Sequence, residues 1–348
     1  MRNGDPNFPL LRLPQNEILR VLKSMGTFEI ILFSFSTKKS KTLVESAGLN
    51  PRSGANIIIG HGIGATVFLP NQSYPQWTFY RNEFQNRQPN QVPMNVAVPG
   101  SVTFSCEGKS YELTGMLLTL KEWIDHIKTI FHTPEAHQLW FLNDEGFFNI
   151  ESIRDAVGKM DSVQITSPGT DEQNQEKMKA FILRKRISLG NNVWQVRKPP
   201  GSVLLQNFDT LEVGDGDGTS SMALDDLIIM NGKWNHAALD NFTEKDMNRY
   251  LKLWISGRCS CKMEQLMVQL TTQEDWLNKS AVLKGIQYQE VDKNKKRWYK
   301  CSTDDHLSWP IEGGYDIRRR DGTRATILFD DNWVEMYVWH DYCIVDKE

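Results

Sequence analysis

Apolar residues between positions 8 and 49 recur with the period of an α-helix. Side chains spaced i, i+3, i+4 and i+7 lie on one face of a helix. Three successive stripes have this spacing: Ile18, Val21, Leu22 and Met25, then Phe28, Ile31, Leu32 and Phe35, then Ser40, Leu43, Val44 and Ala47. Pro14 suits a helix start and Gly48 suits a helix end, so the segment predicts three short helices.

The middle helix is apolar on two sides, because Ile30 and Phe33 lie behind its main stripe. A helix that is apolar on both faces is buried on both faces. One face can close a small helical core, and the other needs a different chain or domain. Leu10, Leu11 and Leu13 add apolar surface just upstream. Since about forty residues rarely fold unaided, we expect this segment to fold against a partner.

From residue 50 to residue 115 the pattern changes to short runs of β-branched and aromatic residues, which are typical of strands. These runs lie at 56–59, 66–69, 77–80 and 102–104. The glycine-rich stretch 60–64 lacks the spacing of a dinucleotide-binding loop, and it predicts a turn between two strands.

A repeating pattern follows a helical stripe at 120–131: apolar, two residues, apolar, one residue, apolar. Copies begin at residues 136, 160, 208, 224 and 263, with a degenerate copy at 184. The first step of about 24 residues lies within the range of leucine-rich repeats, whose units each give a parallel strand and a returning helix. Helical stripes lie between copies, and the one at 247–255 begins with the capping-box pair Thr243 and Asp246. We predict an irregular leucine-rich-repeat-like α/β array.

The C-terminal part returns to strands. Asp321-Gly322, between 317–320 and 325–329, predicts a two-residue hairpin because glycine tolerates positive φ. Residues 333–339 predict a third strand, and 284–288 and 297–299 are candidates to complete a β meander that closes the array. The predicted fold class is therefore α+β or α/β. Its domains are a helical segment at 7–49, a β-rich region at 50–115 and the repeat-like domain with its meander at 116–348.

Composition and charge limit the classes of partner that the chain is expected to bind. The chain has 348 residues and a net charge of −3, which gives no global attraction to nucleic acid or membrane. A basic region at 293–300 and 318–324 is interleaved with acids, so a solvated, partly paired surface is favoured over a nucleic-acid groove. Strand alternation would also split the three arginines 318–320 between two faces. Five cysteines without a disulfide pattern, and no secretory signal or membrane span, predict a cytoplasmic or nuclear protein.

The sequence contains no nucleophile elbow, metalloprotease helix or P-loop lysine, so we do not expect an enzyme. A zinc site would have to be assembled from Cys259, Cys261, Cys301, His306 and Cys343, which lack the usual spacing. Residues 214–218 lack the ligand ladder of a calcium loop. We therefore predict no cofactor and no metal, and we expect the cysteines to act as small core residues.

Two parts of the chain resemble a known family. Residues 8–14 (Phe-Pro-Leu-Leu-Arg-Leu-Pro), 17–19 (Glu-Ile-Leu) and 34–39 resemble an F-box, which docks on the Skp-type adaptor of cullin-based SCF ubiquitin ligases. Residues 240–257 and 315–327 resemble the type 2 F-box-associated domain of a large, mainly nematode family. The resemblance implies a substrate receptor that binds the adaptor, through it a cullin, and an unknown client protein.

The resemblance also implies a set of adaptor-binding residues. These are Pro9, Leu10, Leu11, Leu13, Pro14, Ile18, Leu22, Ile30 and Phe33. Ser40 stands where many F-boxes have a tryptophan, so a protein-interaction scaffold outside any ligase, with a degenerate F-box, is the alternative function.

Overall fold

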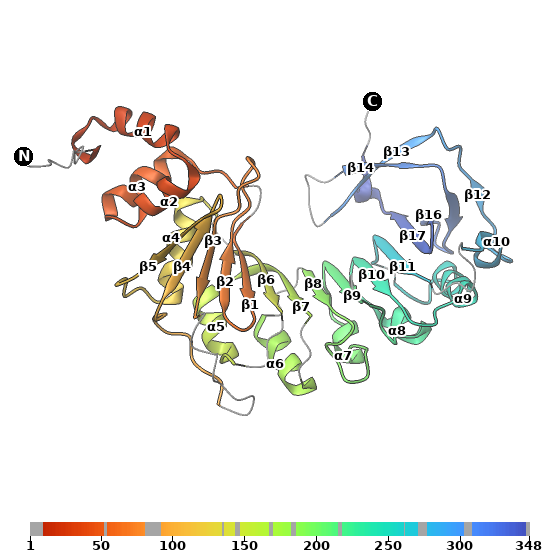
Figure 1. Cartoon of the computed structure of the whole chain (residues 1–348). Coiled ribbons are helices and arrows are strands. Elements are labelled where there is room, and N and C mark those ends of the chain that lie inside the picture. The colour runs from red at the N-terminus through yellow and green to blue at the C-terminus, as the bar shows by residue number, and fades with distance from the viewer. Residues whose placement is uncertain are drawn as a thin grey trace, which may run out of the picture. The chain divides into compact units, whose positions relative to one another are not determined.

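The computed structural model describes residues 10–51, 54–80, 92–133, 136–142, 147–166, 170–181, 186–214, 218–260, 262–270, 277–302 and 308–345. The chain forms two compact units (Figure 1). Unit 1 contains Met1–Asp161 and Glu176–Leu183, and unit 2 contains Ser162–Gln175 and Arg184–Glu348. The predicted ranges 7–49 and 50–115 thus share one unit with the first part of 116–348.

Unit 1 begins with the helices that the apolar stripes predicted. They are η1 (Leu10–Arg12), α1 (Gln15–Ser24), α2 (Thr27–Ser34) and α3 (Lys38–Ala47). Local chemistry explains both ends of α3. Thr37 accepts a hydrogen bond from the Ser40 amide at its start, and Gly48 adopts φ 73° at its end. Such a left-handed cap costs glycine little.

A sheet follows the helices in unit 1, with strand order β6-β1-β2-β3-β4-β5. Its strands are β1 (Asn56–Ile59), β2 (Ile63–Thr66), β3 (Gln76–Phe79), β4 (Val102–Cys106), β5 (Lys109–Leu113) and β6 (Ala136–Phe141). Only β1 and β6 pair in parallel among these registers. The predicted turn at 60–64 is present, with the Gly60 amide bonded to the Gly62 carbonyl at 2.9 Å.

One strand prediction in this sheet was wrong, and one strand was not predicted. The strand expected at 66–69 lies at Ile63–Thr66 instead, because the tight turn after β1 sets the pairing, and Leu69 instead closes a loop on the Ser73 carbonyl. β5 was missed because four of its five residues are exposed, so it has no apolar alternation. Helices α4 (Leu120–Ile130) and α5 (Ile150–Val157) confirm their stripes, and Trp123 of α4 lies 5.9 Å, centroid to centroid, from Phe79 of β3.

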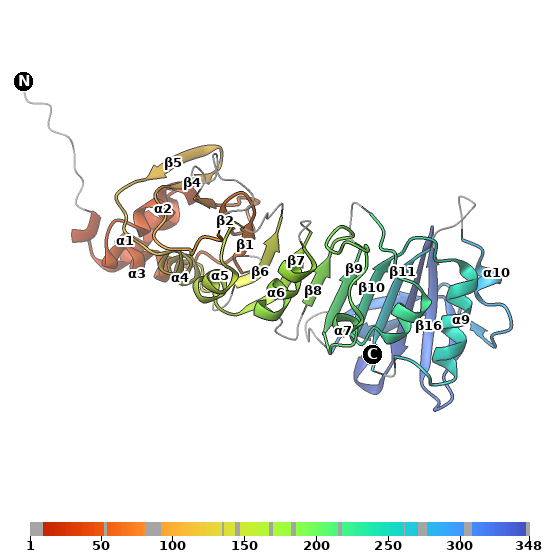
Figure 2. The same cartoon turned by 90° about the horizontal axis from the view of Figure 1, so that it is seen from below.

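Unit 2 is built on parallel strands joined by helices (Figures 1 and 2). Its ladder runs from β7 (Met160–Ile165), of which unit 2 holds the part from Ser162, through β8 (Arg186–Leu189), β9 (Thr210–Val213) and β10 (Trp234–Ala238) to β11 (Gln265–Gln269). The helices in this stretch are α6 (Asp171–Phe181), of which unit 2 holds the part up to Gln175, α7 (Gly201–Leu204), α8 (Leu224–Ile229) and α9 (Glu244–Ile255). The predicted mixture of helix and strand is confirmed.

The register explains the recurring apolar pattern. One row across the ladder is Ile165, Leu189, Val213, Ala237 and Val268, and all of these side chains are buried. The copy expected as a strand at 224–229 is wrong, because it forms α8, where Asp226 accepts a hydrogen bond from the Ala223 amide at 2.9 Å. The strand is β10 instead. Its buried Asn235 stands where the other strands have an apolar residue, which hid the pattern.

Antiparallel strands extend this sheet beyond β11 in the order β11-β17-β16-β15-β12. They are β12 (Gln289–Glu290), β15 (Tyr315–Arg318), β16 (Arg324–Asp330) and β17 (Trp333–Trp339), and α10 (Lys279–Val282) precedes them. A hairpin is present at Asp321-Gly322, with Gly322 at φ 94°, but the predicted two-residue loop is wrong. Arg318 pairs with Arg324 and the Arg319 amide donates to the Thr323 carbonyl at 2.8 Å, so the turn centres on Asp321. The strand expected at 284–288 is wrong, because this stretch turns at Gly285 (φ 69°) and pairing begins at Gln289.

A second sheet of unit 2 has the order β14-β13-β18. Its elements are β13 (Lys296–Lys300), β14 (Ser308–Glu312) and β18 (Ile344–Val345), with η2 (Asp341–Cys343) before the last strand. Tyr299, Ile311 and Tyr337 belong to the buried cluster between these strands and β17. Among all described residues, no helix is both long enough and apolar enough to cross a bilayer.

Candidate functional site

The structure sorts the predicted adaptor-binding residues by exposure. Ile18 and Leu22 are 1% exposed and Ile30 is 3% exposed, so all three belong to the core of unit 1. Partly exposed are Leu10, Leu11, Leu13 and Phe33, and Pro14 is exposed. Pro9 lies outside the described residues. The partly exposed residues and Pro14 are therefore the part of the set that another chain can reach.

The main apolar stripe of α2 packs against other parts of unit 1. Phe28 stacks on Phe104 of β4 with ring centroids 5.2 Å apart. Phe35, just after α2, lies 5.0 Å from Trp123 and 4.0 Å from His126, both on α4. The sequence required a different chain or domain for one apolar face of α2, and for the face with Phe28 and Phe35 the rest of unit 1 provides that cover. On the other face, Ile30 is buried and Phe33 is partly exposed.

His126 links α4 to α2 through a buried hydrogen bond. Its Nε2 lies 2.8 Å from the Ser34 Oγ, which itself donates to the Ile31 carbonyl at 2.6 Å. Burial, together with the nearby charge of Lys41, lowers the pKa of His126 to about 3. The imidazole is therefore neutral at physiological pH, since charging it here would require desolvating a cation.

Ser40 has a structural role that explains its place in an apolar stripe. It is fully buried, and its Oγ accepts from the Thr37 amide at 2.8 Å and donates to the Thr37 carbonyl at 2.7 Å. With the reciprocal bond from the Ser40 amide, this is a capping box. A tryptophan at this position could not make these bonds.

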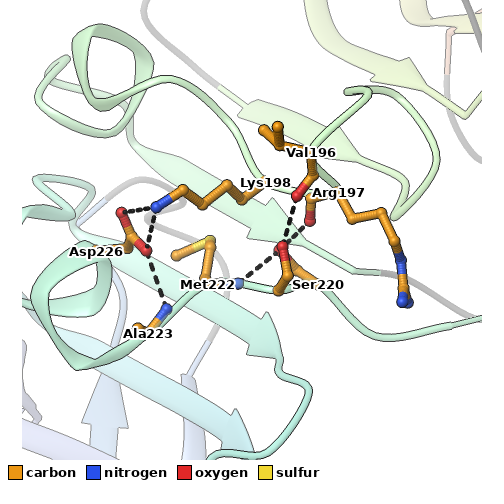
Figure 3. Close-up of polar contacts among 8 residues, drawn as sticks. Val196, Arg197, Lys198, Ser220, Met222, Ala223 and Asp226 are labelled. Atoms are coloured by element: carbon orange, nitrogen blue, oxygen red, sulfur yellow. Dashed lines mark hydrogen bonds and ion pairs between the residues drawn. The ribbon is translucent and has the colours of Figure 1, made fainter.

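Loops at the carboxyl ends of β8 and β9 are joined by polar contacts (Figure 3). We call this cluster the loop clasp: Arg197, Lys198, Ser220, Asp226 and Asp240. Ser220 donates to the Arg197 carbonyl at 2.8 Å, and Lys198 lies 3.2 Å from the Asp226 carboxylate. Arg197 pairs with Asp240 at 3.1 Å. Carboxyl ends of parallel strands often bind ligands, but here each cation of the clasp has an acid of its own chain.

A second polar region of unit 2 is a pocket of about 470 Å³. Its lining comes from α9, the segment 285–289, β15 and β16. We call it the basic pocket, because the charged residues described in its lining are Lys252, Arg318, Arg324 and Asp316. Tyr288 and Ile255 supply apolar surface.

Asp316 is tied into a hydrogen-bond network behind the pocket. Arg297 Nη1 donates to both carboxylate oxygens at 2.8 and 2.9 Å, and Thr326 Oγ1 donates to Oδ1 at 2.6 Å. The Trp339 indole in turn donates to Thr326 Oγ1 at 2.7 Å. The Arg297 side chain is 11% exposed, so this is a largely desolvated ion pair.

The basic region predicted as a solvated surface has a more specific arrangement. Arg319 is buried, lies 5.3 Å from the Trp254 ring and pairs with Asp321 at 2.8 Å, which holds the pKa of Asp321 well below its usual range. Arg318 and Arg320 are exposed. The three arginines are split as predicted, with Arg319 buried between two exposed neighbours, but strand alternation is not the cause, because β15 ends at Arg318 and the other two lie in the turn. The pocket beside Arg318 was not foreseen.

The cysteines that the structure describes are buried. These are Cys106, Cys259, Cys301 and Cys343. Burial raises the pKa of Cys343 to about 12 and that of Cys106 to about 11, so both are protonated thiols. Among the described residues no group of three His, Cys, Asp or Glu side chains is placed to hold a metal ion. Cys261, His306 and residues 215–217 lie outside the described part.

Lys252 and Arg324 were missed as site residues by the sequence analysis. The predicted hairpin brings together the two strands that carry Arg318 and Arg324, but a two-residue turn at Asp321-Gly322 would place Arg319, not Arg318, opposite Arg324. The observed pairing of Arg318 with Arg324 needs a loop that is one residue longer. The contribution of α9 and of the 285–289 segment depends on tertiary packing, and no pattern in the sequence indicates it.

Comparison with known proteins gives a family match for part of the chain. Residues 200–268 match the F-box associated family. Over 338 residues the chain is 19% identical to the F-box associated domain-containing protein sdz-33 of Caenorhabditis elegans, covering 96% of this chain and 98% of that protein. No solved structure matches. The resemblance to the F-box-associated domain is confirmed, and the 240–257 signature falls inside the matched range. The F-box resemblance at 8–39 and the 315–327 signature lie outside it.

Proposed function

We propose that this chain, whose residues 200–268 carry an F-box associated domain, is the substrate-recognition subunit of an SCF-type ubiquitin ligase. The N-terminal helices bind a Skp-type adaptor and, through it, a cullin, and unit 2 holds a client protein. The observation that supports this proposal is the family match, which lies downstream of helices whose sequence resembles an F-box. The chain acts without catalysis, by raising the local concentration of the client near an enzyme held by other subunits.

The docking surface proposed for the adaptor centres on η1. Leu10, Leu11 and Leu13 keep part of their surface exposed. Lys39 of α3 donates to the Leu11 carbonyl at 2.8 Å, which holds η1 against the helices. A few apolar anchors usually carry most of an interface. Ile18, Leu22 and Ile30 then support this surface from beneath instead of touching the adaptor.

Binding of the full-length protein to a purified Skp-type adaptor tests the proposal by calorimetry. Replacing Leu10, Leu11 and Leu13 together by alanine should weaken binding at least about tenfold, because anchor truncations cost more than about 1.4 kcal/mol in total. The matched control is Lys23→Ala, an exposed change on α1, which should bind as the wild type does.

Thermal melting of each variant shows whether unit 1 keeps its fold. Ile18→Ala is unsuitable as a test, since truncating a core leucine or isoleucine costs about 2–5 kcal/mol of stability. Wild-type protein that does not bind the adaptor would contradict the ligase function. If the leucine and lysine variants lose adaptor binding to the same extent, η1 is not part of the interface.

A protein-interaction scaffold with a degenerate F-box is the second candidate. The burial of Ile30 within unit 1 and the capping role of Ser40 favour it, because both reduce the surface available to an adaptor. Co-purification separates the two functions: recovery of adaptor together with cullin supports the ligase, and recovery of adaptor without cullin supports the scaffold.

A further inference from the structure

The basic pocket of unit 2 holds more positive charge than its own chain neutralises. Asp316 is the acid among the described lining residues, and it already accepts bonds from Arg297 and Thr326. Arg324 lies 3.9 Å from it, at the outer limit of an ion pair. In the part of the chain that the structure describes, no acid or hydrogen-bond acceptor pairs with the Lys252 ammonium or the Arg318 guanidinium.

Two of these cations face each other directly. Arg318 and Arg324 are register partners across the β15–β16 hairpin. Like charges directly opposite in a sheet destabilise it. Glu290 does not relieve them, because it stands opposite Tyr315 and is not among the described lining residues. An anion placed in the pocket would remove the repulsion.

The remaining walls leave the cations accessible. A side chain at Gly285 would meet the Lys252 Nζ at 3.6 Å, and its φ of 69° disfavours any other residue, so the ammonium stays uncovered on this side. Tyr288 is 50% exposed and packs edge-on against Tyr315 at 5.3 Å, forming an aromatic wall. The volume of about 470 Å³ lies within the range of ligand pockets, roughly 300–1,000 Å³.

We propose that the basic pocket binds an oxyanionic side chain, a phosphate monoester or a carboxylate, on an exposed segment of the client. The identity of the occupant as a client segment rests on the proposed function. Arg318 and Arg324 supply planar forks that match either group in a bidentate manner, and Lys252 supplies a point charge. Because the site is open to solvent, binding weakens as ionic strength rises.

Peptide pools test this with the full-length protein. Each pool has random flanking residues and one fixed centre: phosphoserine, phosphothreonine, glutamate, serine or lysine. Fluorescence anisotropy should show binding to the phosphorylated and glutamate pools above the serine pool, with the lysine pool weakest. Tighter binding of the phosphorylated pools than of the glutamate pool identifies a phosphorylated client, and equal binding identifies an acidic sequence.

Charge reversal locates the binding. Arg318→Glu should weaken binding to the anionic pools at least about tenfold, and Lys252→Glu should do so independently. Arg320→Glu is the matched control, because it makes the same charge change two residues along the chain without altering the pocket lining, and it should bind as the wild type does. Thermal melting and the milder Arg318→Ala variant separate lost binding from lost folding.

The proposal is overturned if the pools bind equally, if none binds, or if Arg318→Glu and Arg320→Glu lose binding to the same extent. Adaptor binding through η1 is measured separately with the same protein. If the anionic peptides bind and the adaptor does not, the anion-binding pocket is supported and the ligase function is contradicted. If the adaptor binds and the peptide pools bind equally, the ligase function is supported and the anion-binding pocket is contradicted.

Discussion

The loop clasp and the basic pocket both gather arginine and lysine in unit 2, but they differ in how those charges are paired. In the clasp, Arg197 pairs with Asp240 and Lys198 with Asp226. In the pocket, Arg318 faces Arg324, and Asp316 is already bound by Arg297. The difference separates cations that stabilise the fold from cations that are available to a ligand.

Topology accounts for the difference. Successive parallel strands end at the same edge, so the loops that follow them run side by side, and Asp226 after β9 can pair with Lys198 after β8 (Figure 3). Asp240 after β10 reaches Arg197 in the same way. A tight hairpin instead forces residues at equal distances from its turn to face each other, whatever their charge. Like charges at such a position destabilise the sheet, so we interpret them as serving ligand binding and not folding.

The largest effect on stability is expected for His126 of unit 1, whose Nε2 is hydrogen-bonded to Ser34 of the same chain. Its pKa in the folded protein, about 3, lies below the unfolded value near 6.5. The unfolded chain therefore binds the proton more readily, and the stability that His126 contributes is present above pH 6.5 and lost as pH falls toward 3. Between pH 7 and pH 5 the loss should be about 2 kcal/mol. Urea unfolding at both pH values measures it.

His126→Phe is the control, since it keeps an aromatic ring beside Phe35 and removes the titration. In this variant, the fall in unfolding free energy from pH 7 to pH 5 should be smaller than in the wild type by the contribution of His126. Carboxylates titrate in both proteins, so their effect cancels in the comparison. A pH dependence identical to that of the wild type, or an NMR titration of His126 near pH 6.5, would contradict the assignment.

Breaking the clasp should have an intermediate effect. Asp226→Ala removes the acceptor for the Ala223 amide at the start of α8 and leaves Lys198 without its acid. Loss of a helix cap and of a half-exposed ion pair should cost about 1 kcal/mol in urea unfolding. Asp225→Ala, an exposed change in the same turn, should cost less. Equal costs would mean that the clasp does not stabilise the loops.

The sequence predicted features that depend on neighbouring residues. The helix stripes, the Thr243 cap, the Gly48 stop and the Asp321-Gly322 hairpin all have local causes, and the structure contains each of them, although the loop of the hairpin is one residue longer than predicted. It could not say that unit 1 itself would cover Phe28 and Phe35, because apolar burial is non-directional and carries no information about the partner.

Two other features depended on long-range pairing. The i, i+3 spacing at 224–229 fits a helix as well as a repeat strand, and only the ladder register shows that β10 takes the strand position. The pocket likewise needs α9, the 285–289 segment and the hairpin together. Charged residues scattered over more than seventy positions give no pattern that predicts such a site.

The smallest effect on stability is expected for the exposed cations of the basic pocket. Arg318→Ala and Lys252→Ala remove exposed cations that no acid in the described part of the chain engages, so each should change the unfolding free energy by less than about 0.5 kcal/mol. Arg318→Ala also removes the repulsion with Arg324, so any change should be stabilising. A loss above 1 kcal/mol in either variant would show that the pocket cations hold the fold together as those of the clasp do. Stability that stays level while anionic peptide binding falls would show that these charges are kept for a ligand.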